Sequence, residues 1–301
     1  MVKATKSWKK FPKQLAPRYY KEISPIVERL KRIYKEMIEP ELETLLSDQI
    51  VEVPEDQRSM DSSITDKIAF LFKAFREKYF NQTYNKNQDP KTVAFRRTTE
   101  NRVKEAAKSI ARFHKIKFGN NALSMGGEKL RGEPWLKGYL ADWTVQNVSL
   151  IKDIPLDSIT RIENQVTSSV LRGDSRTFLK DQIQNILKIS ENRAKLIARD
   201  QSNKMYGTLT ELRSHNNGWD FYEWDTVGDE RVRKDHARLN GRIFKFSEPP
   251  ITVTTGSRSG ERNNPSQDIQ CRCIALVVFD QQTINSLRKQ PDGSYAIKKA
   301  A

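Results

Sequence analysis

The chain has 301 residues, of which 37% are hydrophobic and 30% are charged, and its formal net charge is +15. This length allows two domains with a sizeable core, and the positive charge predicts a polyanionic partner, most commonly nucleic acid. Two cysteines exclude a disulfide framework. No apolar run approaches the ~18 residues of a membrane-spanning helix, and the basic N-terminus lacks the apolar core of a signal peptide, so we expect no membrane partner.

Residues 1–20 form a basic arm with interspersed aromatic side chains, including Trp8 and Phe11. Pro12 and Pro17 argue against a helix in this arm. We expect the arm to dock on a partner or on DNA, and a solvated terminus is the alternative.

Residues 21–154 predict a helical and basic N-terminal domain. Apolar residues recur at spacings of three and four in several segments, which is the pattern of amphipathic helices. These helices are expected over residues 24–49, with an interruption at Pro40, and over residues 62–79, 93–115 and 135–148. We expect a loop over residues 119–138 and a link over residues 151–155, and we place the domain boundary in that link.

Positive charge is concentrated in residues 91–131, where eleven Lys and Arg stand against three Glu, giving +8. A helix with this charge could follow the phosphates of double-stranded DNA without reading its sequence. A solvated basic face is the alternative. The nucleic-acid-binding candidates are Arg96, Arg97, Arg102, Lys104, Lys108 and Arg112.

The remaining chain predicts a second domain, residues 155–280, followed by a tail over residues 281–301. Helices are expected across residues 157–213, with Gly173 ending the first and Ser190 capping the last. A small β module follows over residues 219–279, with strands at 219–226, 244–246, 251–255 and 271–279. A helix over residues 229–239, capped by Asp229, interrupts it. The fold class is therefore α+β, mostly helical with a small β-rich C-terminal module.

The β module contains both cysteines, Cys271 and Cys273, together with His236. On a strand the two thiols share a face, and His236 with Asp225 or Asp235 could complete a zinc site. A C-x-C pair with one distant histidine is a weak metal signal, so we expect reduced thiols that pack as small hydrophobic residues and no cofactor, with zinc as the alternative.

Arginines surround these residues in the sequence. Arg231, Arg233, His236 and Arg272 could bind an anion, because guanidinium groups suit phosphate. They could equally form ion pairs with Asp225 and Asp229 that hold the module together.

The spacing of these residues resembles the phage Mu F-like family of minor head proteins, also called head morphogenesis proteins. The resemblance covers roughly residues 155–280. It lies in the combination of Trp224, Asp229, Arg231, Arg233, His236, Gly241, Cys271 and Cys273. The family's helical lead-in ends near an Ala-Arg-Thr-Glu element, where this chain has Ala198, Arg199, Asp200 and Gln201.

The resemblance implies a structural component of the virion that lies inside the head near the portal, after assembly in the host cytoplasm. The implied partners are the portal protein and capsid or scaffold proteins, and the implied role is in head assembly and in packaging or delivery of DNA.

No catalytic residue is assigned, since the sequence has no serine-hydrolase or His-Glu-x-x-His motif. The enzymatic alternative is a nuclease in which His236 acts as base, Arg231 and Arg233 clamp phosphate, and a metal lies at Cys271 and Cys273.

Overall fold

The structure is a computed structural model that describes residues 12–47, 59–80 and 90–297. The side chains of residues 47, 59–63 and 90–97 also lie outside the description. Most of the expected arm, residues 1–11, therefore cannot be compared with the structure. The described chain divides into two compact units, and the long helices α4 (Pro90–Ser124), α5 (Leu136–Arg172) and α6 (Arg176–Asn217) contribute to both.

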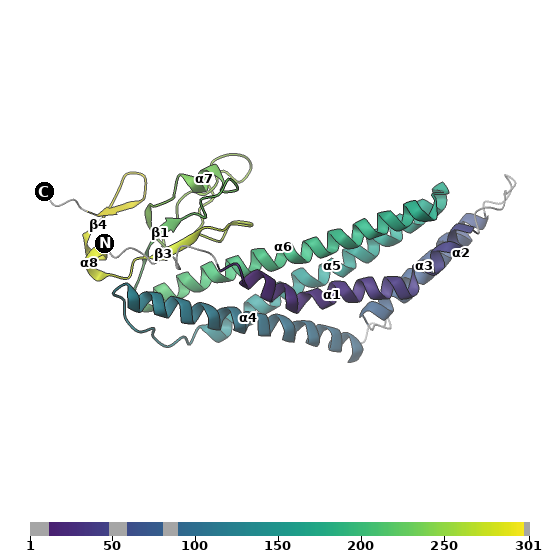
Figure 1. Cartoon of the computed structure of the whole chain (residues 1–301), viewed down its shortest axis with the longest axis horizontal. Coiled ribbons are helices and arrows are strands. Elements are labelled where there is room, and N and C mark those ends of the chain that lie inside the picture. The colour runs from purple at the N-terminus through teal and green to yellow at the C-terminus, as the bar shows by residue number, and fades with distance from the viewer. Residues whose placement is uncertain (1–11, 48–58, 81–89, 298–301) are drawn as a thin grey trace. The chain divides into compact units, whose positions relative to one another are not determined.

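One unit is helical and consists of Tyr19–Glu105 and Asp142–Ala198. These ranges include α2 (Glu41–Ser47), α3 (Ser59–Phe80) and most of α1 (Leu15–Met37). Within it α1, α3, α5 and α6 run side by side (Figure 1). Apolar faces such as that of Phe72 and Phe75 are fully buried between them. The Tyr79 hydroxyl donates to the Ile26 carbonyl at 3.0 Å and joins α3 to α1.

The other unit contains Ala106–Ala141 and Arg199–Ala301. Its five-stranded antiparallel sheet has the order β3-β1-β2-β5-β4. The strands are β1 (Phe221–Asp225), β2 (Ile243–Lys245), β3 (Ile274–Val277), β4 (Leu287–Lys289) and β5 (Tyr295–Ile297). Two short helices, α7 (Lys234–Ala237) and α8 (Gln281–Ser286), lie between strands. The core of this unit is aromatic and includes Trp219, Trp224 and Phe279.

The α+β class predicted from the sequence is confirmed. Several predicted breaks between helices are wrong. The helices continue across them, because the residues on both sides of each break are buried. The α5 helix continues through the expected link at residues 151–155, since Ile154 and Ile159 are buried on either side of Pro155. Ser190 lies inside α6, where its hydroxyl donates to the Ile186 carbonyl at 2.8 Å, so it is no cap.

Other boundaries differ in the same direction. The α1 helix begins at Leu15, ahead of the expected start at residue 24, and Pro17 is tolerated in its first turn. The α4 helix extends to Ser124, because Phe118 and Ala122 are buried in the core. Among the described residues, no helix combines the length and the hydrophobicity needed to cross a membrane.

Three predictions in the β module are also wrong. Residues 251–255 form an isolated bridge between Ile251 and Arg262 instead of a strand. The helix expected over residues 229–239 is the short α7, and Asp229 does not cap it. The expected tail after residue 280 contains the helix α8, followed by β4 and β5, and these two strands extend the sheet. The domain boundary at residues 154 and 155 stays a prediction.

Candidate functional site

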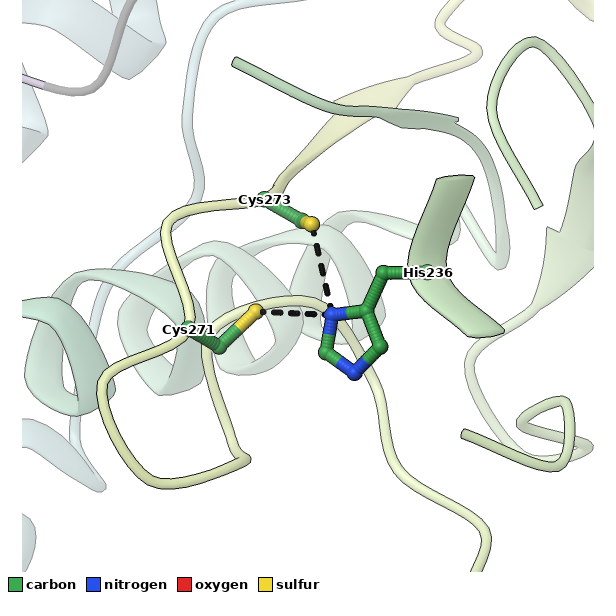
Figure 2. Close-up of side chains that lie close together, drawn as sticks. All are labelled: His236, Cys271 and Cys273. Atoms are coloured by element: carbon green, nitrogen blue, oxygen red, sulfur yellow. Dashed lines mark hydrogen bonds between the residues drawn. The ribbon is translucent and has the colours of Figure 1, made fainter. Parts of the chain in front are cut away.

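The family-like residues gather around α7 and the segment that enters β3. His236 is carried by α7, and Cys271 and Cys273 lie just before β3, which begins at Ile274. Figure 2 shows the His236 ring with one of its nitrogens directed at both thiols. All three side chains are buried, with residue exposures of 2%, 4% and 3%.

Both sulfur atoms approach the same ring nitrogen. The Nδ1 atom of His236 lies 3.5 Å from Sγ of Cys271 and 3.5 Å from Sγ of Cys273 (Figure 2). The cysteines are free thiols. The three ligand atoms lie within 4.8 Å of one another, which is the arrangement of residues able to hold a metal ion.

The other side of the His236 ring faces a carboxylate. Its Nε2 lies 3.1 Å from Oδ2 of Asp268, and both side chains are almost fully buried. The other carboxylate oxygen of Asp268 accepts a hydrogen bond from Asn263 Nδ2 at 3.1 Å. Sequence reasoning missed Asp268. The signal for it was an acidic residue three positions before Cys271.

Burial and close contact shift the acid–base behaviour of this cluster. Burial opposes protonation of His236, but its interactions with Asp268 and Cys271 outweigh burial and raise its pKa to about 9. The hydrogen bond with Cys273 and the contact with His236 lower the pKa of the Cys271 thiol well below its usual value. The hydrogen bond with Cys271, together with burial, raises the pKa of the Cys273 thiol. Without a metal, therefore, the contacts favour a charged His236 ring and an ionised Cys271 thiol over their neutral forms.

Asp229 forms an ion pair with Arg272. The Oδ2 and Oδ1 atoms of Asp229 accept from Nη1 and Nη2 of Arg272 at 2.5 and 2.7 Å. This bidentate contact ties the turn before α7 to the residue between the two cysteines. Asp229 is not a helix cap, because α7 begins at Lys234, beyond its reach. Arg233 adds a second tie by donating to the carbonyl of Ile269 at 2.6 Å.

The C-x-C segment is also fixed to α6 by polar side chains. Asp200 accepts a hydrogen bond from the backbone of Gln270 at 2.6 Å, and Arg199 donates to the Gln270 side chain. Asn203 donates to the Cys271 carbonyl at 2.9 Å. These side chains lie in and just after the lead-in element noted in the sequence. Their role as anchors was not predicted, since nothing in the local pattern connects α6 to a segment 70 residues later.

Trp224 and Gly241 support the cluster from β1 and the turn before β2. The Trp224 ring is fully buried and meets the His236 ring edge to face, with centroids 5.5 Å apart. Gly241 donates to the Trp224 carbonyl at 2.8 Å with φ of +75°, a conformation that favours glycine.

The three cluster residues line a cavity of about 230 Å³ together with four arginines, namely Arg199, Arg231, Arg233 and Arg272. The residues of the predicted anion site therefore line one cavity, and the binding of an anion there stays a prediction. Asp235, one of the two suggested fourth metal ligands, accepts from the Thr254 backbone and hydroxyl at 2.9 and 2.6 Å. Its carboxylate is therefore committed to the loop that contains Thr254.

The nucleic-acid-binding candidates all lie on α4. The side chains of Arg96 and Arg97 are outside the described residues. Arg102 is half-buried and lies 3.9 Å from Glu22. Lys104, Lys108 and Arg112 are exposed, as a phosphate contact requires, and their assignment to DNA stays a prediction.

Comparison with known proteins finds similarity over part of the chain. Residues 160–276 match the family model described as phage Mu protein F like protein. A stretch of 151 residues is 34% identical to an uncharacterised protein of Haemophilus influenzae. It covers 50% of this chain and 32% of that protein, so the chain corresponds to about a third of that relative's length. No solved structure matches the chain.

Proposed function

Since residues 160–276 belong to the phage Mu F-like family of head morphogenesis proteins, we propose that the chain is a minor structural protein of a phage head. It lies in the head interior near the portal and acts in head assembly and in packaging or delivery of DNA. The observation that carries the proposal is the family match over α5, α6 and the sheet as far as β3.

The arrangement of the family-like residues supports a structural role. Asp229 and Arg272 pair with each other, and Arg233 is bonded to the backbone at Ile269. Trp224 is buried in the core. These contacts hold the segments around α7 and β3 in one arrangement. A fixed arrangement of this kind would suit a surface that binds a partner protein.

A nuclease is the competing function, and one observation favours it. Four arginines surround the cavity beside His236, which would suit a phosphodiester. A general base must reach the proton that it removes. The Nε2 and Nδ1 atoms of His236 instead face Asp268 and the two thiols, and the residue is 2% exposed. This geometry favours a structural part for His236 over base catalysis.

A cleavage assay separates the two functions. We expect no cleavage of single- or double-stranded DNA or RNA with magnesium, manganese or zinc present. Cleavage that disappears in His236→Gln, with an unchanged melting temperature, would overturn the structural proposal. His215→Gln is the matched control, because the His215 side chain is 83% exposed and pairs with Asp220 away from the cluster.

The proposed location is tested by co-expression of the full chain with the portal and major capsid proteins of the same phage. Tagged chain should retain the portal protein through size-exclusion chromatography. Retention of the capsid protein alone would contradict a position near the portal. It would still agree with the assignment of the chain as a head protein.

A DNA contact is the second part of the proposal. It rests on the +8 of residues 91–131 and on the exposure of Lys104, Lys108 and Arg112 along α4. Contact through phosphates alone would serve a protein that meets packaged DNA of any sequence.

A further inference from the structure

His236, Cys271 and Cys273 come together from two segments that are 35 residues apart in the chain. The sequence alone favours two buried thiols without a metal. The structure adds that both thiols converge on one nitrogen of one ring (Figure 2).

Hydrogen bonds to the ring alone do not account for both sulfur contacts. A ring nitrogen either accepts one hydrogen along its single lone pair or donates one hydrogen, so Nδ1 satisfies one sulfur and not two. The other sulfur then depends on the hydrogen bond between the two cysteines. A cation among the three atoms satisfies all of them at once.

The sulfur–nitrogen distances are compatible with zinc coordination. Zinc binds thiolate at about 2.3 Å and imidazole nitrogen at about 2.0 Å in a tetrahedron, which separates sulfur from nitrogen by about 3.5 Å. Both observed separations are 3.5 Å. We propose that Nδ1 of His236 and the thiolates of Cys271 and Cys273 bind one Zn²⁺ ion.

Asp268 provides the outer contact that such sites contain. A histidine that ligates a metal usually has its other nitrogen held by a carboxylate, which fixes the ring and raises its basicity. Asp268 lies 3.1 Å from Nε2 and leaves Nδ1 directed at the thiols. The carboxylate and the two thiols are buried on opposite sides of the same ring.

The fourth position of the tetrahedron is filled from the arginine-lined cavity. The three ligand residues themselves line this cavity, so a donor within it can reach the ion. Two thiolates neutralise the zinc charge, and the four surrounding arginines favour a donor that is water or a small anion.

The ion joins α7 to the segment that enters β3. It acts together with the Asp229–Arg272 pair, which crosses the same gap. Zinc binding would therefore stabilise the sheet-containing unit, and its removal would loosen α7 first.

Metal analysis of the full chain tests the proposal. Protein expressed with added zinc and purified under reducing conditions without chelator should carry about one zinc ion per chain. Cys271→Ser and Cys273→Ser should each lose it, and His215→Gln should keep it. Zinc retained at a full equivalent by a folded Cys271→Ser/Cys273→Ser protein would place the ion elsewhere and overturn the proposal.

A second measurement needs no variant, in case the serine proteins fail to fold. Chelator-stripped wild-type protein titrated with Co²⁺ should develop the visible and near-ultraviolet bands of tetrahedral thiolate coordination, and zinc should abolish them. Reduced wild-type protein that shows neither zinc content nor cobalt bands, and no change of melting temperature on adding zinc, would contradict the site.

Discussion

The carboxylate of Asp268 lies 3.1 Å from Nε2 of His236, and both groups are buried. This pair determines which edge of the histidine ring faces the thiols. A buried carboxylate favours a proton on the nitrogen nearest to it, which leaves Nδ1 as the atom available to sulfur or to a metal. Asp268, which is not among the family-like residues, thus orients the His236 ring toward Cys271 and Cys273.

Replacing Asp268 with Asn should weaken zinc binding by about 10–100-fold, because the amide holds the ring without adding negative charge. Competition with a chromophoric chelator measures this affinity. Glu248→Gln is the matched control, since Glu248 pairs with Lys289 and not with Asp268. Equal zinc affinities for Asp268→Asn and wild type would show that the carboxylate does not support a metal ligand.

Gly207 should not tolerate alanine. A Cβ at this position of α6 would lie 2.7 Å from the Pro265 carbonyl oxygen and 2.8 Å from Cβ of Ser266. The added methyl group would push the loop before Cys271 away from α6, at a cost of about 1–3 kcal/mol in unfolding free energy.

Gly138→Ala is the control for this prediction. Gly138 lies in α5 with no atom near its Cβ position, so alanine there should stabilise by up to about 1 kcal/mol. Urea denaturation of both variants measures the difference. If Gly207→Ala were as stable as wild type, the close packing of the loop on α6 would be wrong.

Acid should destabilise the sheet-containing unit through Glu133. Its carboxylate pairs with the buried Arg213 at 2.5 Å and with Lys115 at 3.1 Å. Burial raises the pKa of Glu133, but the hydrogen bonds and charges of Arg213 and Lys115 outweigh it and hold the pKa below 4.5. Because the folded pKa is the lower one, the stabilisation is complete above pH 4.5 and disappears as the pH falls through the folded value.

Glu133→Gln should therefore melt below wild type at pH 7, by the equivalent of about 1–3 kcal/mol for a charged hydrogen bond. The difference should shrink as the pH falls below 4.5 and through the lowered pKa of the folded state. Glu128→Gln, at an exposed position nearby, should match wild type throughout. A difference for Glu133→Gln that stays constant across this range would exclude the ionised pair as its source.

Non-specific DNA binding should depend on α4. Reversing the charge of Arg96, Arg97, Lys104 and Lys108 should weaken binding to unrelated duplexes. The slope of log binding constant against log salt concentration should become shallower by ~0.9 for each phosphate that is no longer neutralised. Gel shifts at several salt concentrations measure both effects. The control reverses four exposed lysines elsewhere, namely Lys137, Lys152, Lys188 and Lys234. Equal weakening in both variants would show that total charge, and not this helix, governs the affinity.

Much of the fold follows from periodicity. The apolar spacing predicted the helices, and the aromatic run at residues 219–226 predicted β1. The sequence failed where distant contacts outweigh local signals. Pro155 predicts the end of a helix, yet α5 continues past it because the residues on both sides are buried in the core. Residues 287–289 and 295–297 read as a tail because β4 and β5 are only three residues each and gain their stability by pairing.

The candidate site was predictable in its members and not in its geometry. Spacing indicated His236, Cys271 and Cys273 as one set. It could not show that both sulfurs meet one nitrogen or that Asp268 holds the other, since those facts depend on how α7 lies against the segment before β3. The anchoring of that segment by Asp200 and Asn203 of α6 is equally a property of the fold.

The most direct test of a head protein is the protein content of purified phage particles. Particles from the phage that encodes this chain would be separated on a density gradient, washed in high salt and analysed by quantitative mass spectrometry. We expect a few copies of the chain per particle. This number should be far below that of the major capsid protein and comparable to that of the portal protein. Abundant chain in the lysate with none in washed, filled particles would contradict its assignment as a component of the head.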